Sequence, residues 1–140
     1  MVEPRVVIGV VGDDIHVVGN RIIQLALEES GFSVTNLRTR NRPEHFCEAA
    51  LEVNADAVLV SSINGEGGHW CSDMRLQFNE SGLTRTLLYV GGNLVVGRRA
   101  ASDVEREFKR YGFDRVYHQL NDIGIAIDHL KADLSARDTP

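Results

Sequence analysis

The sequence has little of several features that would each assign it to a particular class of protein. Its 140 residues include only two cysteines, Cys47 and Cys71, which form no C-x-x-C pattern, so we expect a reducing, cytoplasmic setting. No apolar run approaches the length that spans a bilayer, and residues 1–5 do not have the form of a signal peptide. The formal net charge of -5 argues against nucleic acid or an acidic membrane surface as a general partner.

What the sequence does contain is a regular alternation of apolar runs and helical patterns. A chain with 43% hydrophobic and 25% charged residues is typical of a globular protein, and we expect one domain spanning residues 1–140. Runs rich in Val, Leu, Ile, Phe and Tyr predict strands over 5–11, 32–37, 57–61, 86–90 and 115–117. Helical patterns predict helices over 17–30, 43–53, 71–81, 102–111 and 122–134.

Five successive strand-helix units predict an α/β fold. We expect a flavodoxin-like (Rossmann-like), doubly wound, five-stranded parallel sheet with the strand order 2-1-3-4-5. Ligands of such sheets bind at the carboxyl ends of the strands, where the strand order reverses. Here that point lies between the first and third strands, at the loops 12–16 and 62–70.

Several residues predict where the helices begin and end. Gly31 is expected to end the first helix as a C-terminal cap, and Asn41 is a possible cap for the second, with Pro43 in its first turn. Ser102 and Glu105 have the spacing of a capping box for the fourth helix. An apolar face on the first helix is formed by Val18, Ile22, Leu25 and Ala26.

The most informative segment follows the first predicted strand. It contains Asp14, His16 and Gly19 in a D-x-H-x-x-G pattern. In an extended backbone residues two apart point the same way, so the carboxylate can orient an imidazole that ligates a transition metal. Gly19 removes a side chain near the start of the helix. The alternative is that Asp13 or Asp14 caps the first helix and His16 is a solvated loop residue.

Two further segments are predicted to lie at the same edge of the sheet. Ser61, Ser62 and Ile63 follow the third strand, and the pair Gly91-Gly92 follows the fourth. Together with the first pattern they resemble the cobalamin-binding domain family, whose motifs are DxHxxG, SxL and GG. Ile63 replaces the leucine, which nearly conserves volume.

This resemblance implies a cofactor site. It assigns His16 to cobalt, in place of the lower base of cobalamin, and Asp14 to the hydrogen bond that orients His16. It also implies that Gly19 admits the nucleotide tail and that Ser61 meets the buried base. The full set of expected cofactor contacts is Asp14, Ile15, His16, Val17, Val18, Gly19, Ser61, Ser62, Ile63, Gly91, Gly92, Asn93 and Val95.

Other segments, at 89–93, 95–97 and 112–117, are similar to the small (sigma or S) subunits of glutamate mutases. That similarity implies a subunit of an adenosylcobalamin-dependent isomerase that interconverts L-glutamate and 3-methylaspartate by radical rearrangement. It implies a larger, barrel-type (epsilon or E) partner that binds the substrate, a heterotetramer, no catalytic residue in this chain and no activity without the partner. The loops 64–70 and 118–122 depart from the family pattern, which leaves room for a changed partner or substrate.

Other functions fit parts of the sequence. A stand-alone cobalamin carrier or sensor, or a subunit of a related mutase, would share the same motifs. A methyl-transferring corrinoid protein usually has an N-terminal helical bundle, whereas this chain starts at its first strand. A phosphoacceptor receiver domain needs an aspartate at the end of its third strand and a lysine after its fifth strand. This chain has Ser61 and Tyr117 near those places, so we reject that function.

The remaining candidate residues have simpler explanations. His69 and Cys71 alone are too few ligands for a metal site, and His45, His118 and His129 are expected at the surface. Trp70, the only tryptophan, either anchors the third helix in the core or belongs to a docking face for the larger subunit.

Overall fold

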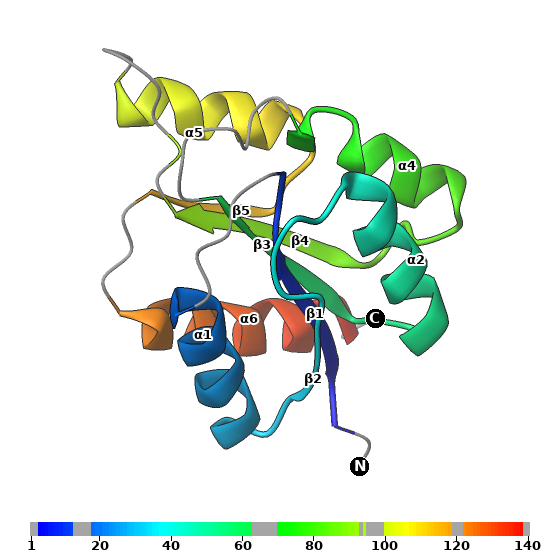
Figure 1. The fold of residues 1–140 in the computed structure, drawn as a ribbon, viewed down its shortest axis with the longest axis vertical. Helices are drawn as coiled ribbons and strands as arrows, with labels where there is room; N and C mark the ends of the chain where they lie inside the picture. The colour runs from blue at the N-terminus through cyan, green and yellow to red at the C-terminus, as the bar shows by residue number, and fades with distance from the viewer. Residues whose placement is uncertain are drawn as a thin grey trace.

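A computed structural model describes residues 3–12, 18–62, 70–92, 94, 100–118 and 122–138. Strands and helices alternate along the chain (Figure 1). They are β1 (Arg5–Val10), α1 (Val18–Glu29), β2 (Ser33–Asn36), α2 (Pro43–Val53), β3 (Ala57–Ser62), α4 (Met74–Glu80), β4 (Leu87–Gly92), α5 (Ala101–Arg110), β5 (Arg115–His118) and α6 (Ile123–Asp138). Neighbouring strands are parallel in the order β2-β1-β3-β4-β5, so the predicted flavodoxin-like topology is confirmed.

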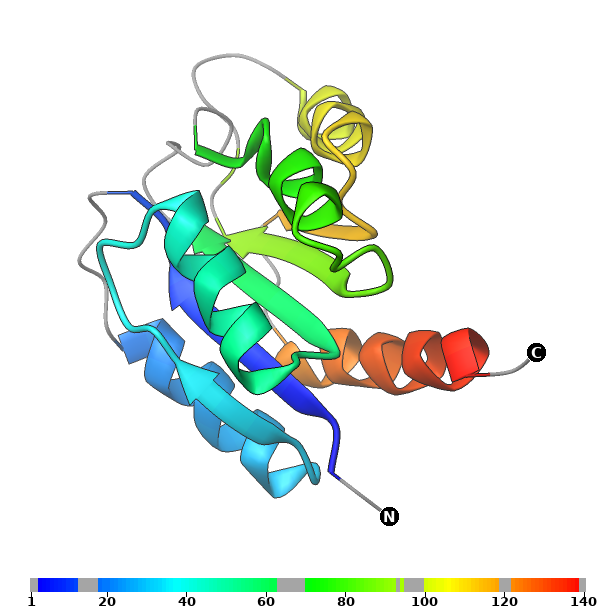
Figure 2. The ribbon, with the colours of Figure 1, turned by 90° about the vertical axis from the view of Figure 1, so that its right-hand side faces the viewer.

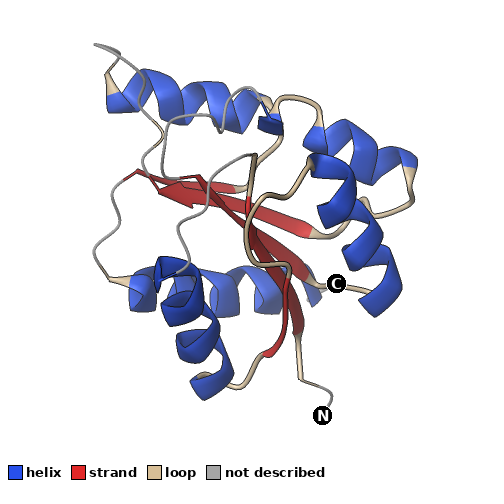
Figure 3. Cartoon of the chain, viewed as in Figure 1, coloured by secondary structure: helices blue, strands red, loops and turns tan. Residues whose placement is uncertain are grey.

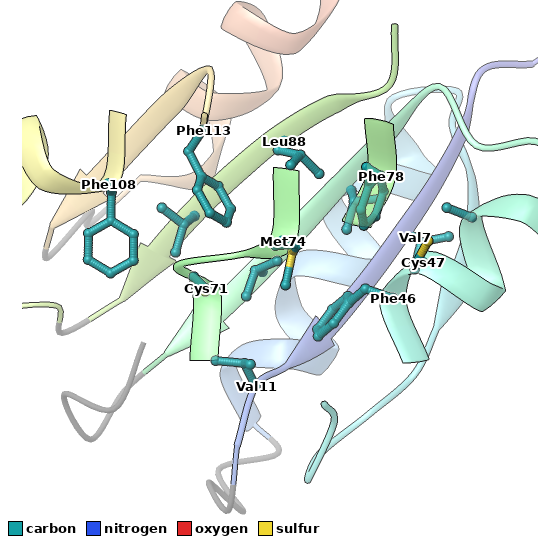
Figure 4. Close-up of a cluster of buried hydrophobic side chains, with 14 of the residues drawn as sticks. Val7, Val11, Phe46, Cys47, Cys71, Met74, Phe78, Leu88, Phe108 and Phe113 are labelled. Atoms are coloured by element: carbon teal, nitrogen blue, oxygen red, sulfur yellow. The ribbon is translucent and has the colours of Figure 1, made fainter. Parts of the chain in front are cut away.

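Helices cover both faces of the sheet (Figures 1 and 3). On one face α2, α4 and α5 bury Phe46, Phe78 and Phe108 in a single apolar cluster (Figure 4). On the other face α1 and α6 contribute Leu27 and Leu130 to a second cluster. Figure 2 gives the view from the side of α2 and α4, which lie over the strands. None of the described helices is both long and apolar enough to cross a bilayer.

The three central strands, β1, β3 and β4, are largely buried on both sides, which explains their apolar sequences. Successive side chains of β3 point to opposite faces: Val58 and Val60 join the α2–α4–α5 cluster, whereas Leu59 joins the α1–α6 cluster. The same alternation separates Ser61 from Ser62, so only one of the two hydroxyls can face α1 and α6.

The expected end of the first helix is confirmed. Gly31 has a left-handed φ of 94°, and the Phe32 N–H donates to the Leu27 carbonyl oxygen at 3.1 Å. This is the bonding of a Schellman motif, and it requires a residue that tolerates positive φ at position 31.

Two predicted N-caps are wrong. Arg42, not Asn41, caps α2, because the Asn41 side-chain amide instead donates to the Arg38 carbonyl oxygen at 3.0 Å and holds the loop after β2. Pro43 does occupy the first turn of α2. At α5 the cap is Ala100, with no side-chain hydrogen bond, because the helix begins one residue before Ser102.

Two helix limits also differ from the prediction. A turn at residues 72–73 delays the start of α4 to Met74. In contrast, α6 continues past residue 134 to Asp138. Its last turn is held by tertiary contacts, since Arg137 donates to the Asp56 carboxylate at 2.8 Å and accepts at its carbonyl oxygen from Arg85 at 2.6 Å.

Candidate functional site

A cavity of about 350 Å³ lies on the α1–α6 face, at the carboxyl ends of β1, β3 and β4. Its volume is within the range of small-molecule sites. Most of its wall is apolar, and the lining residues are Val10, Gly19, Asn20, Ile22, Ile23, Leu59, Val60, Ser61, Tyr89, Val90, Gly91, Gly92, Tyr117, Ile123 and Ala126. A hollow of about 320 Å³ at the opposite edge is lined largely by charged groups that pair with each other, such as Arg137 and Asp56.

The cavity brings together residues that the three sequence motifs supply separately. Gly19 comes from α1, Ser61 from β3, and Gly91 and Gly92 from β4. Parallel register explains the arrangement, because Ser61 pairs with Gly91 and Ser62 with Gly92 in neighbouring strands. The juxtaposition expected at the sheet edge is therefore present, and contact of these residues with a cofactor stays a prediction.

Glycine occupies positions 19, 91 and 92 of this wall for different structural reasons. Gly92 has a φ of 121°, and a Cβ there would lie 2.8 Å from the carbonyl carbon of Ser62. A Cβ on Gly91 would make an ordinary contact, 3.6 Å from the Cβ of Tyr117, and one on Gly19 would meet nothing within 4 Å. Glycine is required by the backbone only at position 92, whereas at 19 and 91 its absent side chain leaves space beside the cavity.

Two tyrosines form the aromatic part of the wall, and α6 holds both of their hydroxyls. The rings of Tyr89 and Tyr117 have centroids 5.9 Å apart. The Tyr89 hydroxyl donates to the Asp133 carboxylate, and the Tyr117 hydroxyl shares a hydrogen bond of 2.7 Å with Nδ1 of His129. Asp133 also accepts two hydrogen bonds from the Arg115 guanidinium, at 2.7 and 2.8 Å.

These contacts set the charge of the wall. Burial raises the pKa of Tyr89, and it raises the pKa of Tyr117 to about 12. The hydrogen bonds from Arg115 lower the pKa of Asp133. At neutral pH both phenols are therefore uncharged, and the Asp133 charge is balanced by Arg115. Such a cavity suits an uncharged, planar aromatic group with few polar atoms.

Sequence reasoning missed this network, and it misplaced two histidines. His129 is partly buried and its ring stacks on Tyr117, while Nδ1 of the partly buried His118 accepts from the Leu94 N–H at 3.1 Å. A surface position is confirmed only for His45, whose Nδ1 accepts from the Arg42 N–H at 3.0 Å. No local pattern marks the contacts of His129 and His118, because they join residues of β5 to α6 or to the loop after β4.

Two other expectations are also refined by the structure. On α1, Ile22 and Leu25 are 55% and 47% exposed, so the predicted apolar face is not wholly buried, although Ile22 lines the cavity. Cys71 is fully buried, which raises its pKa to about 12 and removes it as a metal ligand.

Trp70 is half-buried against the α2–α4–α5 cluster, and the Arg42 guanidinium lies 4.1 Å from its ring centroid. These contacts support the anchoring role that the sequence left open. A docking role stays a prediction.

Several of the predicted contacts lie outside the described residues. They are Asp14, Ile15, His16, Val17, Ile63, Asn93 and Val95, and the side chain of Val18 is likewise not described. The described chain on both sides of the first motif reaches the cavity, since Val10 of β1 and Gly19 of α1 both line it. Among the residues that the structure does describe, no three His, Cys, Asp or Glu side chains form a metal site.

Comparison with known proteins gives consistent results. Residues 4–121 match the model of the B12 binding domain. The chain is 49% identical over 134 residues to the glutamate mutase sigma subunit of Carboxydothermus hydrogenoformans, covering 96% of this chain and 98% of that protein. It is 44% identical over 135 residues to the sigma subunit of Clostridium cochlearium, again covering 96% and 98%.

Solved structures share the fold at lower identity. A cobalamin-binding protein from Desulfitobacterium hafniense has a TM-score of 0.76 at 20% identity, over 93% of this chain and 58% of that one. The signal receiver domain of NarL from Mycobacterium tuberculosis has a TM-score of 0.66 at 14% identity, over 95% and 97%. Because both types of protein match, the fold alone does not separate them.

Proposed function

This chain belongs to the B12-binding domain family and, within it, to the glutamate mutase sigma subunits, and from this premise we propose that it is the cobalamin-binding subunit of an adenosylcobalamin-dependent glutamate mutase. The enzyme would interconvert L-glutamate and 3-methylaspartate by radical rearrangement. The observation that carries the proposal is the single cavity in which Gly19, Ser61, Gly91 and Gly92 meet, although the sequence supplies them from three separate motifs.

The described residues fit the nucleotide tail of cobalamin. The tail ends in a flat, uncharged aromatic base, and the cavity is an apolar chamber with two neutral phenols in its wall. The space at Gly19, where a Cβ would touch nothing within 4 Å, gives a bulky group room beside the first turn of α1. A charged group would be less suitable here, because its desolvation would not be compensated.

The proposed roles follow from these positions. His16 ligates cobalt, and Asp14 holds the imidazole in the tautomer and orientation that ligation needs. Ser61 meets the buried base, while Gly91 and Gly92 leave room for the tail. The remaining contacts of the site are assigned to Ile15, Val17, Val18, Ile63, Asn93 and Val95. Ser62 was expected among them, but it is fully buried, does not line the cavity and points to the opposite face from Ser61, so its side chain is given no contact. When bound, adenosylcobalamin supplies the radical through homolysis of its cobalt–carbon bond.

This chain's part in the reaction is to bind, orient and enclose the cofactor. We propose that residues 1–140 form one domain, that the protein acts in the cytoplasm, and that a larger barrel-type subunit completes a heterotetramer. A chain of this size covers one face of a corrin ring, and radical chemistry requires that water be excluded from the other face as well. The isolated chain is therefore expected to be inactive.

The ligand assignment is tested by electron paramagnetic resonance of cob(II)alamin bound to the purified chain. A nitrogen ligand splits the cobalt lines, and incorporation of ¹⁵N-histidine should change each triplet to a doublet. His16→Ala should abolish this protein-dependent splitting, while His45→Ala, at an exposed position on α2, should retain it. A splitting that survives His16→Ala and still changes on ¹⁵N-histidine labelling would show that the ligand has been wrongly assigned.

The activity is tested by adding a barrel-type glutamate mutase subunit and adenosylcobalamin to the wild-type chain. Formation of 3-methylaspartate from L-glutamate supports the proposal. Tight cobalamin binding without turnover in that complex would instead favour a carrier, a sensor or a mutase of another substrate.

A further inference from the structure

The cavity wall contains a side-chain hydrogen-bond donor that none of the described residues pairs with. Asn20, in the first turn of α1, is only 3% exposed, and its side-chain Nδ2 has no hydrogen-bond partner. Within the described part of the chain, the Ser62 hydroxyl is the one other buried side-chain polar atom in this condition. Buried polar groups of native proteins are nearly always paired, so an unpaired amide in the wall of a cavity indicates a partner that comes from outside the chain.

The other polar groups of the same wall are in a different state. The hydroxyl of Tyr89 is bonded to Asp133, and that of Tyr117 is bonded to His129. Apart from Ser61, the rest of the lining consists of glycine and aliphatic side chains. A ligand in the cavity therefore lies beside the Asn20 side chain, whose buried Nδ2 has no bonded partner among the described residues, whereas both phenols already have partners on α6.

Asn20 can use this donor without any movement of the backbone. The terminal torsion of an asparagine side chain has a broad energy profile, so the amide can turn toward an acceptor at little cost. The nucleotide of a cobamide offers uncharged acceptors of the right kind in its base and its ribose.

We propose that Asn20 binds the nucleotide part of the cofactor by donating a hydrogen bond from Nδ2, and that it thereby selects cobamides that carry a nucleotide over cobinamide, which has none. This proposal rests on the function proposed above. It adds a residue that lies outside the three motifs and whose role follows from its burial, its missing partner and its place in the cavity wall.

A ligand-binding role and a purely structural role predict opposite effects on the chain without cofactor. If Asn20 serves the ligand, its buried Nδ2 donor is unsatisfied in the free chain, so replacing Asn20 by an apolar residue should not lower stability. If Asn20 serves the fold, the same replacement should destabilise the free chain. Asn20→Ala removes the amide, and Asn20→Leu removes it while keeping a side chain of similar length. Arg21→Ala is the matched control, because Arg21 is the next residue of α1, is exposed and does not line the cavity.

The experiment measures two quantities for each variant. The affinity for aquacobalamin and for diaquacobinamide is determined by absorption titration, and the thermal midpoint of the cofactor-free chain is determined by circular dichroism. Both Asn20 variants should bind cobalamin about tenfold more weakly, a loss typical of one buried hydrogen bond, with less than about twofold change for cobinamide. Their thermal midpoints should equal or exceed that of the wild-type chain. Arg21→Ala should match the wild type in its affinity for both ligands.

Three outcomes would overturn the inference: unchanged cobalamin affinity in both Asn20 variants, an equal loss for cobalamin and cobinamide, or a lowered thermal midpoint in both variants. As an independent measurement, the ¹H–¹⁵N signals of the Asn20 side chain should shift on addition of cobalamin and not of cobinamide. A wild-type chain that binds no cobalamin would instead refute the proposed function, so the two failures are distinguishable.

Discussion

The carbonyl group of Ser62 occupies the place where a side chain at Gly92 would begin. The two residues are register partners in β3 and β4, and a Cβ on Gly92 would lie 2.8 Å from the Ser62 carbonyl carbon and closer still to its oxygen. Gly92 also has a φ of 121°, which L side chains rarely adopt. The two strands can therefore approach each other at the cavity edge only with glycine at this position.

Gly92→Ala is expected to destabilise the fold by at least about 2 kcal/mol, because backbone strain and the clash with Ser62 act together. Urea unfolding followed by circular dichroism measures this change.

Gly91→Ala is the matched variant, because its Cβ would make only ordinary contacts with Tyr117. Its free energy of unfolding should lie within about 1 kcal/mol of the wild-type value. It should bind cobalamin more weakly, since the added methyl group enters the cavity wall. Equal stability losses in the two variants would contradict the different reasons assigned to the two glycines.

Asp133 joins the sheet to α6 by accepting from both Tyr89 and Arg115. Its side chain is 23% exposed, so the pair is partly screened by solvent. Asp133→Ala should lower the free energy of unfolding by about 1–3 kcal/mol, because the Tyr89 hydroxyl and the Arg115 guanidinium lose their partner. Asp128→Ala, at an exposed position on the same helix, should change stability by less than about 0.5 kcal/mol.

The same carboxylate should make stability depend on pH in the acid range. Arg115 holds the pKa of Asp133 below the ordinary value of 3.8, so the folded chain releases this proton more readily than the unfolded chain does. The contribution is therefore fully present above about pH 5 and is lost as pH falls through 4 toward the folded pKa. Between pH 5 and pH 3, Asp133→Asn should lose less unfolding free energy than the wild type. Parallel losses in both proteins would indicate that other groups dominate acid unfolding.

Trp70 packs against the α2–α4–α5 cluster beneath the Arg42 guanidinium. Trp70→Ala should lower the free energy of unfolding by about 2–3 kcal/mol, less than for a fully buried tryptophan because this side chain is half-buried. Leu76→Ala on α4 is the control, because Leu76 is 57% exposed and should contribute little. An unchanged stability together with weaker binding of the barrel subunit would assign Trp70 to docking instead.

Much of the architecture could be predicted because it depends on local patterns. Alternating apolar runs and helical segments predicted the strands to within two residues at each end, and the handedness of parallel connections then favoured the order that is observed. The sequence also indicated that Ser61 and Gly91 lie at one sheet edge, since both follow core strands. Helix caps were less predictable, although Asn41 and Ser102 both have the chemistry of a cap. The Asn41 side chain is used in a tertiary contact instead, and α5 begins one residue before Ser102.

The sequence by itself therefore determined the topology and the edge at which the motifs meet, because both follow from strand order and residue spacing. Only the tertiary structure decided what the cavity wall is made of. It placed the hydroxyls of Tyr89 and Tyr117 against Asp133 and His129 of α6, and it left the Asn20 amide buried without a partner. These relationships join residues distant in the chain, and they depend on how α1 and α6 pack on the sheet, which no local pattern encodes.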